Sequence, residues 1–117
     1  GGRLFLGAGA LADALARLGG AVYWAGKPHA TAYAAARAKA EQLRGAAVSD
    51  REILVIGDAV RTDLAGAAGA GLDALFIAGG IHREETMRDG KIDPGKLAAV
   101  LTADAPPALA AMSGLAW

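Results

Sequence analysis

Residues 53–63 read ILVIGDAVRTD, and this stretch decides the fold. Its first four residues are aliphatic without a polar interruption, which is typical of a strand buried on both faces of a parallel sheet. Two carboxylates follow, Asp58 and Asp63, and a helix is expected to start near Thr62. Because open α/β sheets bind ligands beyond the carboxyl ends of their strands, we expect both acids in that crevice. Oxygen ligands of this kind suit a divalent cation.

Helices and strands alternate along the rest of the chain. They are expected, in order, as a strand at 3–6, a helix at 11–18, a strand at 21–24, a helix from 28 to 44, the strand at 53–56, a helix at 62–70, a strand at 74–77, a loop at 79–93 with one helical turn near Glu84, and a helix from 94. Pro106 and Pro107 are expected to end that last helix, and residues 108–117 fit a helix or a strand equally well. The alternation predicts an α/β fold with a doubly wound parallel sheet.

Side-chain patterns add detail to two of these helices. In the helix after Pro28, the expected buried stripe consists of Tyr33, Ala36, Ala40 and Leu43. The helix at 62–70 should end at Gly71 in the left-handed conformation, with Leu72 packing back onto it.

The composition excludes several classes of function. The 117 residues amount to one domain at most, and many of the 54% that are hydrophobic are alanines, so the core should be thin. Because 12 basic and 12 acidic residues are interspersed and balance, no nucleic-acid partner is expected. There are no cysteines, hence no disulfide or thiol chemistry, and no apolar run approaches the ~18 residues that would span a membrane. We expect a cytoplasmic protein.

Three segments resemble motifs of one enzyme superfamily, in the right order. GDAVRTD (57–63) resembles the fourth motif of the haloacid dehalogenase-like (HAD) hydrolases. AGKPH (25–29) is similar to the third motif in their class IIA branch, the NagD-like phosphatases, and AGGIH (78–82) to the loop after the next strand in that branch. The resemblance covers essentially the whole chain and implies a Rossmann-like HAD core.

Two motifs of that family do not occur in these residues. The first, Asp-x-Asp-Gly, supplies the nucleophilic aspartate, and the second is a Ser or Thr at the end of a strand. The resemblance therefore leads us to expect the C-terminal part of a hydrolase, inactive by itself. Residues 1–25 would be the C-terminal end of an α/β cap domain, and residues 26–117 the C-terminal half of the core domain.

The resemblance also implies roles for three residues. Asp58 would coordinate Mg²⁺ together with the missing nucleophile, although an aspartate after a strand is also a common turn residue. Asp63 would support the metal site, through water or by pairing with the lysine, although an acid at a helix start is favoured electrostatically in any case. Lys27 would bind the transferring phosphoryl group, beside a helix N-terminus that itself favours anions.

Other polar residues carry weaker signals. Thr62 could cap the following helix as readily as take part in catalysis. His82 lies near Glu84 and Glu85, but the spacing does not suit a helical pair of metal ligands, and we expect an exposed loop histidine. His29 is expected to hydrogen-bond at a helix start, and a place near the substrate stays open.

The whole enzyme would be a Mg²⁺-dependent phosphomonoesterase acting on a small phosphorylated metabolite that the sequence does not name. In the HAD fold the nucleophile strand lies beside the strand at 53–56. Without it, that strand should present an unpaired apolar edge. We expect this edge to pair with the missing N-terminal half or with a second copy of the chain.

Two further functions remain open. Residues 7–12 read GAGALA, which matches a dinucleotide-binding turn between a strand and a helix. That fingerprint expects an acid about 20 residues later, where this chain offers Lys27, so an NADP-binding or nucleotide-binding module is the first alternative. A non-catalytic interaction module is the second, because the charges are balanced and the core is thin.

Overall fold

The structure, a computed structural model, describes residues 6–116. Its helices are α1 (Ala8–Arg17), α2 (Ala30–Arg44), α3 (Ala65–Gly69), α4 (Arg83–Thr86) and α5 (Pro94–Val100), with a 3-10 turn η1 (Asp50–Glu52) and a π-helical turn η2 (Val60–Leu64). Its strands are β1 (Leu54–Gly57), β2 (Asp73–Ile77), β3 (Met87–Arg88), β4 (Lys91–Ile92) and β5 (Ala110–Met112). The strand expected at 3–6 falls largely on residues 1–5, outside the described residues.

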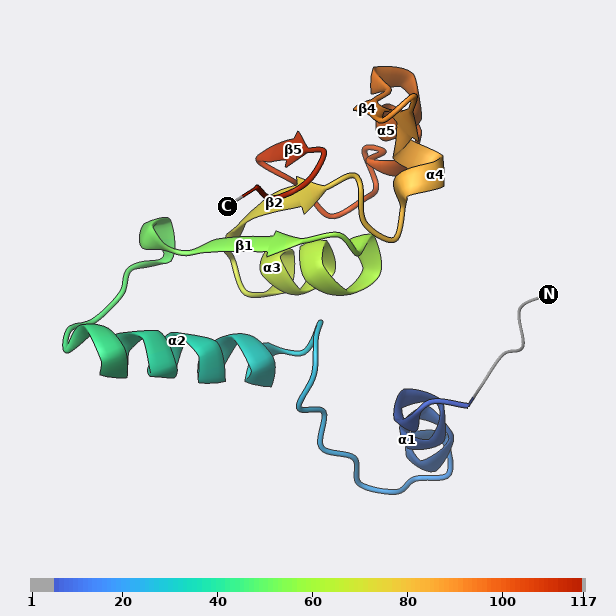
Figure 1. Cartoon of the computed structure of the whole chain (residues 1–117). Coiled ribbons are helices and arrows are strands. Elements are labelled where there is room, and N and C mark those ends of the chain that lie inside the picture. Colours follow the sequence, from blue (N-terminus) through green and yellow to red (C-terminus); the bar gives the residue numbers. More distant parts are fainter. Residues whose placement is uncertain (1–5, 117) are drawn as a thin grey trace.

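A parallel sheet with the strand order β1-β2-β5 forms the centre of the molecule (Figure 1). Val55 pairs with Ala74 between β1 and β2, and Phe76 pairs with Ala111 between β2 and β5. The predicted α/β fold with a parallel sheet is therefore confirmed. The chain end that suited either a helix or a strand forms β5, because the open edge of β2 offers its backbone groups a partner.

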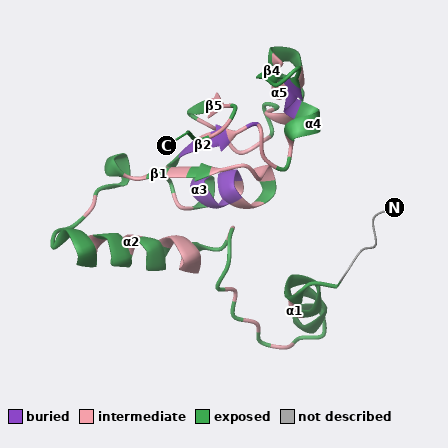
Figure 2. Cartoon of the chain, in the orientation of Figure 1, coloured by how far each residue is buried: buried purple, intermediate pink, exposed green. Residues whose placement is uncertain are grey.

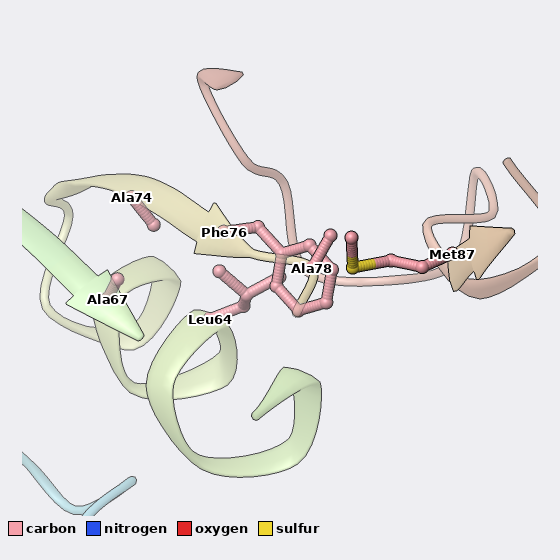
Figure 3. Packing of buried hydrophobic residues seen from close by; sticks show 6 residues of the cluster. All are labelled: Leu64, Ala67, Ala74, Phe76, Ala78 and Met87. Carbon is pink, nitrogen blue, oxygen red and sulfur yellow. The ribbon is translucent and has the colours of Figure 1, made fainter. Parts of the chain in front are cut away.

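The core gathers where β2 faces η2 and α3. Along β2 and just beyond it, alternate residues are buried, as expected for one face of a strand. Among the residues that the structure describes, the buried hydrophobic side chains are Leu64, Ala67, Ala74, Phe76, Ala78 and Met87 (Figure 3). Three of these six are alanines, so the core is as thin as the composition predicted.

The helix expected at 62–70 starts earlier and with a different geometry. It opens with the π-helical turn η2, where the amides of Asp63 and Leu64 both donate to the carbonyl of Ala59 at 2.8 and 3.2 Å. Thr62 lies inside this turn and its side chain caps nothing, so the capping prediction was wrong. The predicted end is confirmed: Gly71 has φ +69°, and the amide of Leu72 donates to a carbonyl of α3 at 2.9 Å.

Burial on both faces of β1 was wrongly predicted. Leu54 and Ile56 are each 46% exposed, since β1 is the edge strand of this sheet within residues 6–116 and pairs there only with β2. Figure 2 shows the exposed and half-buried residues of β1 beside the buried stretch of β2. The edge position itself agrees with the predicted unpaired apolar edge.

Helix α2 covers β1 only loosely. A groove of about 330 Å³ separates them and is lined by Tyr33, Ala36, Arg37, Ala40, Ile53, Leu54, Val55 and Leu72. Tyr33, Ala36 and Ala40 of the predicted stripe line this groove. Leu43, its fourth member, is 76% exposed, so the stripe as predicted is not buried. Gly45 ends the helix in the left-handed conformation, with φ +72°.

The N-terminal part extends away from the sheet (Figure 1). The radius of gyration is 16.5 Å, against ~13 Å for a compact domain of this length. Helix α1 forms where expected, but its leucines at 11, 15 and 18 are 62%, 49% and 85% exposed. The strand predicted at 21–24 was wrong: these residues form no ladder, because no other strand of residues 6–116 pairs with them.

The segment after β2 holds more structure than expected. The predicted turn near Glu84 is α4, but β3 and β4 then form an unpredicted antiparallel hairpin. Asp89 and Gly90, with φ +51° and +76°, make its two-residue turn, and Asp-Gly is a strong hairpin signal that the sequence did carry. Helix α5 begins at Pro94 as predicted, with Asp93 as its N-cap.

Within residues 6–116, no helix is both long and apolar enough to cross a bilayer.

Candidate functional site

An ion pair joins two of the three predicted site residues. Lys27 Nζ lies 2.5 Å from Asp63 Oδ1, although the residues are 36 positions apart. The Asp63 side chain is only 4% exposed, whereas that of Lys27 is 56% exposed. The amide of Ala59 donates to the other carboxylate oxygen, Asp63 Oδ2, at 3.1 Å. Both oxygens of this buried acid are thus engaged by the chain itself.

Gly57, the last residue of β1, makes this placement possible. A Cβ at position 57 would lie far closer to the Asp63 side chain than the 3.0 Å that real Cβ atoms keep. The π-helical turn brings Asp63 back over the end of the strand. The missing side chain of Gly57 therefore gives the carboxylate its room.

Asp58 lies at the same end of β1 as Asp63. It directly follows β1, and its Oδ2 accepts a hydrogen bond of 2.9 Å from the amide of Ile81, in the loop after β2. Gly80 packs against the same carboxylate so closely that a Cβ there would overlap it. The carboxyl ends of β1 and β2 meet at this point, because the two strands are parallel neighbours in the sheet.

Charge interactions connect the three residues. The hydrogen bond that Lys27 donates to Asp63 raises the pKa of Lys27. Burial opposes this rise, and the negative charges of Asp63 and Asp58 and the Tyr33 side chain add to it. Lys27 therefore remains a cation at neutral pH. Burial also raises the pKa of Tyr33, whose hydroxyl donates to the carbonyls of Thr62 and Asp63 at 3.3 Å each.

Neither histidine behaves as predicted. His82 is half-buried rather than exposed: its side chain is 24% exposed, its Nδ1 lies 2.6 Å from Glu85 Oε2, and its ring is tilted against Phe76. His29 is the N-cap residue of α2, but its side chain makes no capping hydrogen bond. Its ring instead stacks on Trp24, with centroids 4.8 Å apart and an angle of 17° between the planes. Each histidine ring therefore lies against an aromatic side chain, and His82 also pairs with Glu85.

The acids could supply part of a cation site. No cluster of three or more acidic or histidine ligands forms among residues 6–116. Magnesium typically takes only one or two protein carboxylates and fills its other positions with water and phosphate oxygens. Asp58 fits this pattern, since Ile81 engages only its Oδ2. Asp63 is better suited to holding Lys27, because both of its oxygens are already in use.

The backbone amide of Ile81 and the hydroxyl of Tyr33 also belong to the site and were not predicted from the sequence. The Ile81 amide and the Tyr33 hydroxyl leave no trace in a motif, because any residue carries an amide and any helix can carry a tyrosine. The paired glycines at 79 and 80 were the available signal, since adjacent glycines after a strand indicate a close backbone approach.

The comparisons with known proteins point to one family of hydrolases. A family model described as HAD-hydrolase-like matches residues 24–104. Among solved structures, the chain is similar to a hydrolase of the haloacid dehalogenase-like family from Brucella suis 1330, with 40% sequence identity and a TM-score of 0.64 over 92% of this chain. The chain spans only 36% of that protein's length. No curated protein matches.

Proposed function

Because the chain belongs to the family of HAD-like hydrolases, we propose that Lys27, Asp58 and Asp63 form part of a Mg²⁺-dependent phosphomonoesterase site. The observation that carries the proposal is the convergence of these residues. The ion pair of 2.5 Å between Lys27 and the buried Asp63 lies at the end of β1, where Asp58 follows the strand.

Each residue has a distinct task in this site. Lys27 presents a cation to the phosphoryl group and offsets the repulsion between that group and the two carboxylates. Asp63 holds the lysine in place with one oxygen and is itself fixed by Ala59 with the other. Asp58 offers Mg²⁺ a carboxylate oxygen. The metal would stabilise negative charge on the phosphoryl oxygens.

The nucleophile is proposed to come from outside these residues. The motif Asp-x-Asp-Gly is absent from the sequence, and the chain corresponds to 36% of the related hydrolase. We propose that the natural enzyme supplies this aspartate on a strand that pairs with β1, and that the 117 residues alone do not hydrolyse phosphate esters. The 46% exposure of Leu54 and Ile56 supports a missing neighbour at this edge.

The substrate class and subfamily rest on motif resemblance. AGKPH and AGGIH favour the class IIA, NagD-like branch, and hence a small phosphorylated metabolite. An NADP-binding module is less well supported. Its fingerprint needs a second strand after the helix, and residues 21–24 form none.

The test is hydrolysis of p-nitrophenyl phosphate by the natural protein that contains this sequence. We expect turnover with Mg²⁺, none with EDTA, and a loss of at least ~100-fold in Asp58→Asn, as is typical when a group that stabilises transition-state charge is removed. Asp104→Asn is the matched control, because Asp104 is an exposed acid in a different loop. Turnover that survives EDTA or Asp58→Asn would overturn the proposal.

A further inference from the structure

A buried threonine ties together the loop that holds Asp58. Thr86, the last residue of α4, is fully buried. Its hydroxyl lies 2.6 Å from the carbonyl oxygen of Ala78 and 2.8 Å from that of His82, and it shares its one proton between them. These two carbonyls stand at the two ends of the loop 78–82. A single hydroxyl thus fixes the distance between the ends of this loop.

The loop in turn lies directly on the Asp58 carboxylate. The amide of Ile81 donates to Asp58 Oδ2, and Gly80 approaches the carboxylate too closely for any side chain. On its other side the loop is fastened to the chain after β5, where the amide of Gly79 donates to the carbonyl of Ser113 at 3.0 Å. A change in the shape of this loop would therefore move the Ile81 amide away from Asp58 Oδ2.

We propose that Thr86 is a positioning residue for Asp58, acting through the loop 78–82. By closing the loop, its hydroxyl keeps the Ile81 amide on Asp58 Oδ2. Among the hydrogen bonds of residues 6–116, Asp58 Oδ1 accepts none and is the oxygen left for a cation. The metal part of this inference rests on the proposed function, whereas the coupling of Thr86 to Asp58 does not.

A purely structural role would have different consequences. Thr86 also accepts, through its carbonyl, a hydrogen bond of 3.0 Å from the amide of Asp93, and so fastens the start of α5. That bond uses the backbone and survives any substitution of the side chain. If the hydroxyl only satisfied buried carbonyls, its removal would lower stability but leave the Ile81–Asp58 hydrogen bond intact.

The first measurement reads that hydrogen bond by NMR in the natural protein. We expect a through-hydrogen-bond coupling between the Ile81 amide nitrogen and the Asp58 carboxyl carbon. It should persist in Thr86→Ser, which keeps the hydroxyl, and vanish in Thr86→Val, which keeps the shape. Persistence in Thr86→Val, or absence in the wild type, overturns the proposal.

The second measurement is the affinity for Mg²⁺ by calorimetry. Loss of a group that orients a metal ligand typically costs ~10–100-fold in affinity, and we expect this for Thr86→Val. Thr86→Ser and the exposed-site control Thr102→Val should bind like the wild type. Wild-type affinity in Thr86→Val overturns the metal part of the proposal. If Asp58→Asn also binds Mg²⁺ normally, the proposed function fails instead, and the NMR coupling still decides the role of Thr86.

Gly80→Ala covers the case in which Thr86→Val does not fold. The added Cβ would overlap the Asp58 carboxylate and push it off the loop, without touching the Thr86 hydroxyl. We expect the Ile81–Asp58 coupling to vanish and the Mg²⁺ affinity to fall. A folded Gly80→Ala protein with both unchanged would show that the loop does not hold Asp58.

Discussion

Replacing Gly57 by alanine should disturb the site more than any other one-carbon change in β1. The backbone of Gly57 is not in the left-handed region, so alanine meets no conformational strain there. The obstacle is space: the new Cβ would overlap the Cβ and Cγ of Asp63. Asp63 has a short side chain and is 3% exposed, so it cannot swing aside into solvent.

The cost follows from what Asp63 would lose. Overpacking of a dense site costs ~1–3 kcal/mol. If the carboxylate also leaves Ala59 and Lys27, a buried charge loses its partners, which costs ~3–5 kcal/mol for a fully buried pair. The 56% exposure of Lys27 argues for the low end of that range. We therefore expect Gly57→Ala to lower the free energy of unfolding by about 2–4 kcal/mol.

Urea unfolding of the natural protein, followed by circular dichroism, measures this change. Gly69→Ala is the matched control, because Gly69 lies in α3 and a Cβ there meets nothing within 4 Å. This control should leave the free energy of unfolding unchanged or raise it by up to ~1 kcal/mol, because alanine has a higher helix propensity than glycine. If Gly57→Ala unfolds at the same urea concentration as this control, Asp63 does not occupy the space described here.

Three further predictions concern stability. Folding raises the pKa of Lys27 above 10.5, so its pairing with Asp63 contributes its full stability below pH 10.5. This contribution is lost as the pH rises through the higher pKa of the folded state. Lys27→Met should therefore reduce the fall of the melting temperature at alkaline pH. Phe76→Ala should cost ~3–5 kcal/mol in urea unfolding, because the ring is fully buried. The hydrogen bond that the Ser49 amide donates to Glu52 lowers the pKa of Glu52 from 4.5 to about 2. The ionised Glu52 side chain therefore adds to the stability of the fold above pH 4.5, and this stabilisation is lost as the pH falls toward 2. Glu52→Gln should remove this acid dependence from the melting temperature, and an unchanged acid limb would contradict the assignment.

The parts of the fold that could be predicted are those encoded by adjacent residues. An uninterrupted aliphatic run followed by Gly57 and Asp58 was enough to place β1 and the turn after it. A similar run placed β2, and Pro94 placed the start of α5. In each case the local pattern and the tertiary structure favour the same conformation.

Predictions failed where distant neighbours decide the outcome. Residues 21–24 are rich in strand-forming side chains, but no strand lies beside them within the described residues, so their backbone stays irregular. Burial of β1 failed for the same reason, because an edge strand leaves Leu54 and Ile56 half-exposed. Periodicity shows which face is apolar, but not whether anything covers it.

The candidate site, too, could be predicted only in part. Lys27, Asp58 and Asp63 were found from their motifs, but the direct pairing of Lys27 with Asp63 was only one of two options. Which one the chain adopts depends on the π-helical turn η2, which brings Asp63 over Gly57. No pattern in the sequence signals that turn.

The position of a bound metal ion shows whether Asp58 is a metal ligand and Asp63 is the partner of Lys27. We would grow crystals of the natural protein with Mn²⁺ in place of Mg²⁺ and find the ion by its anomalous scattering. We expect one ion coordinated by an oxygen of Asp58, with Asp63 still paired to Lys27 and outside direct coordination. An ion bound directly to Asp63 with Lys27 displaced, or an ion away from the end of β1, would contradict it.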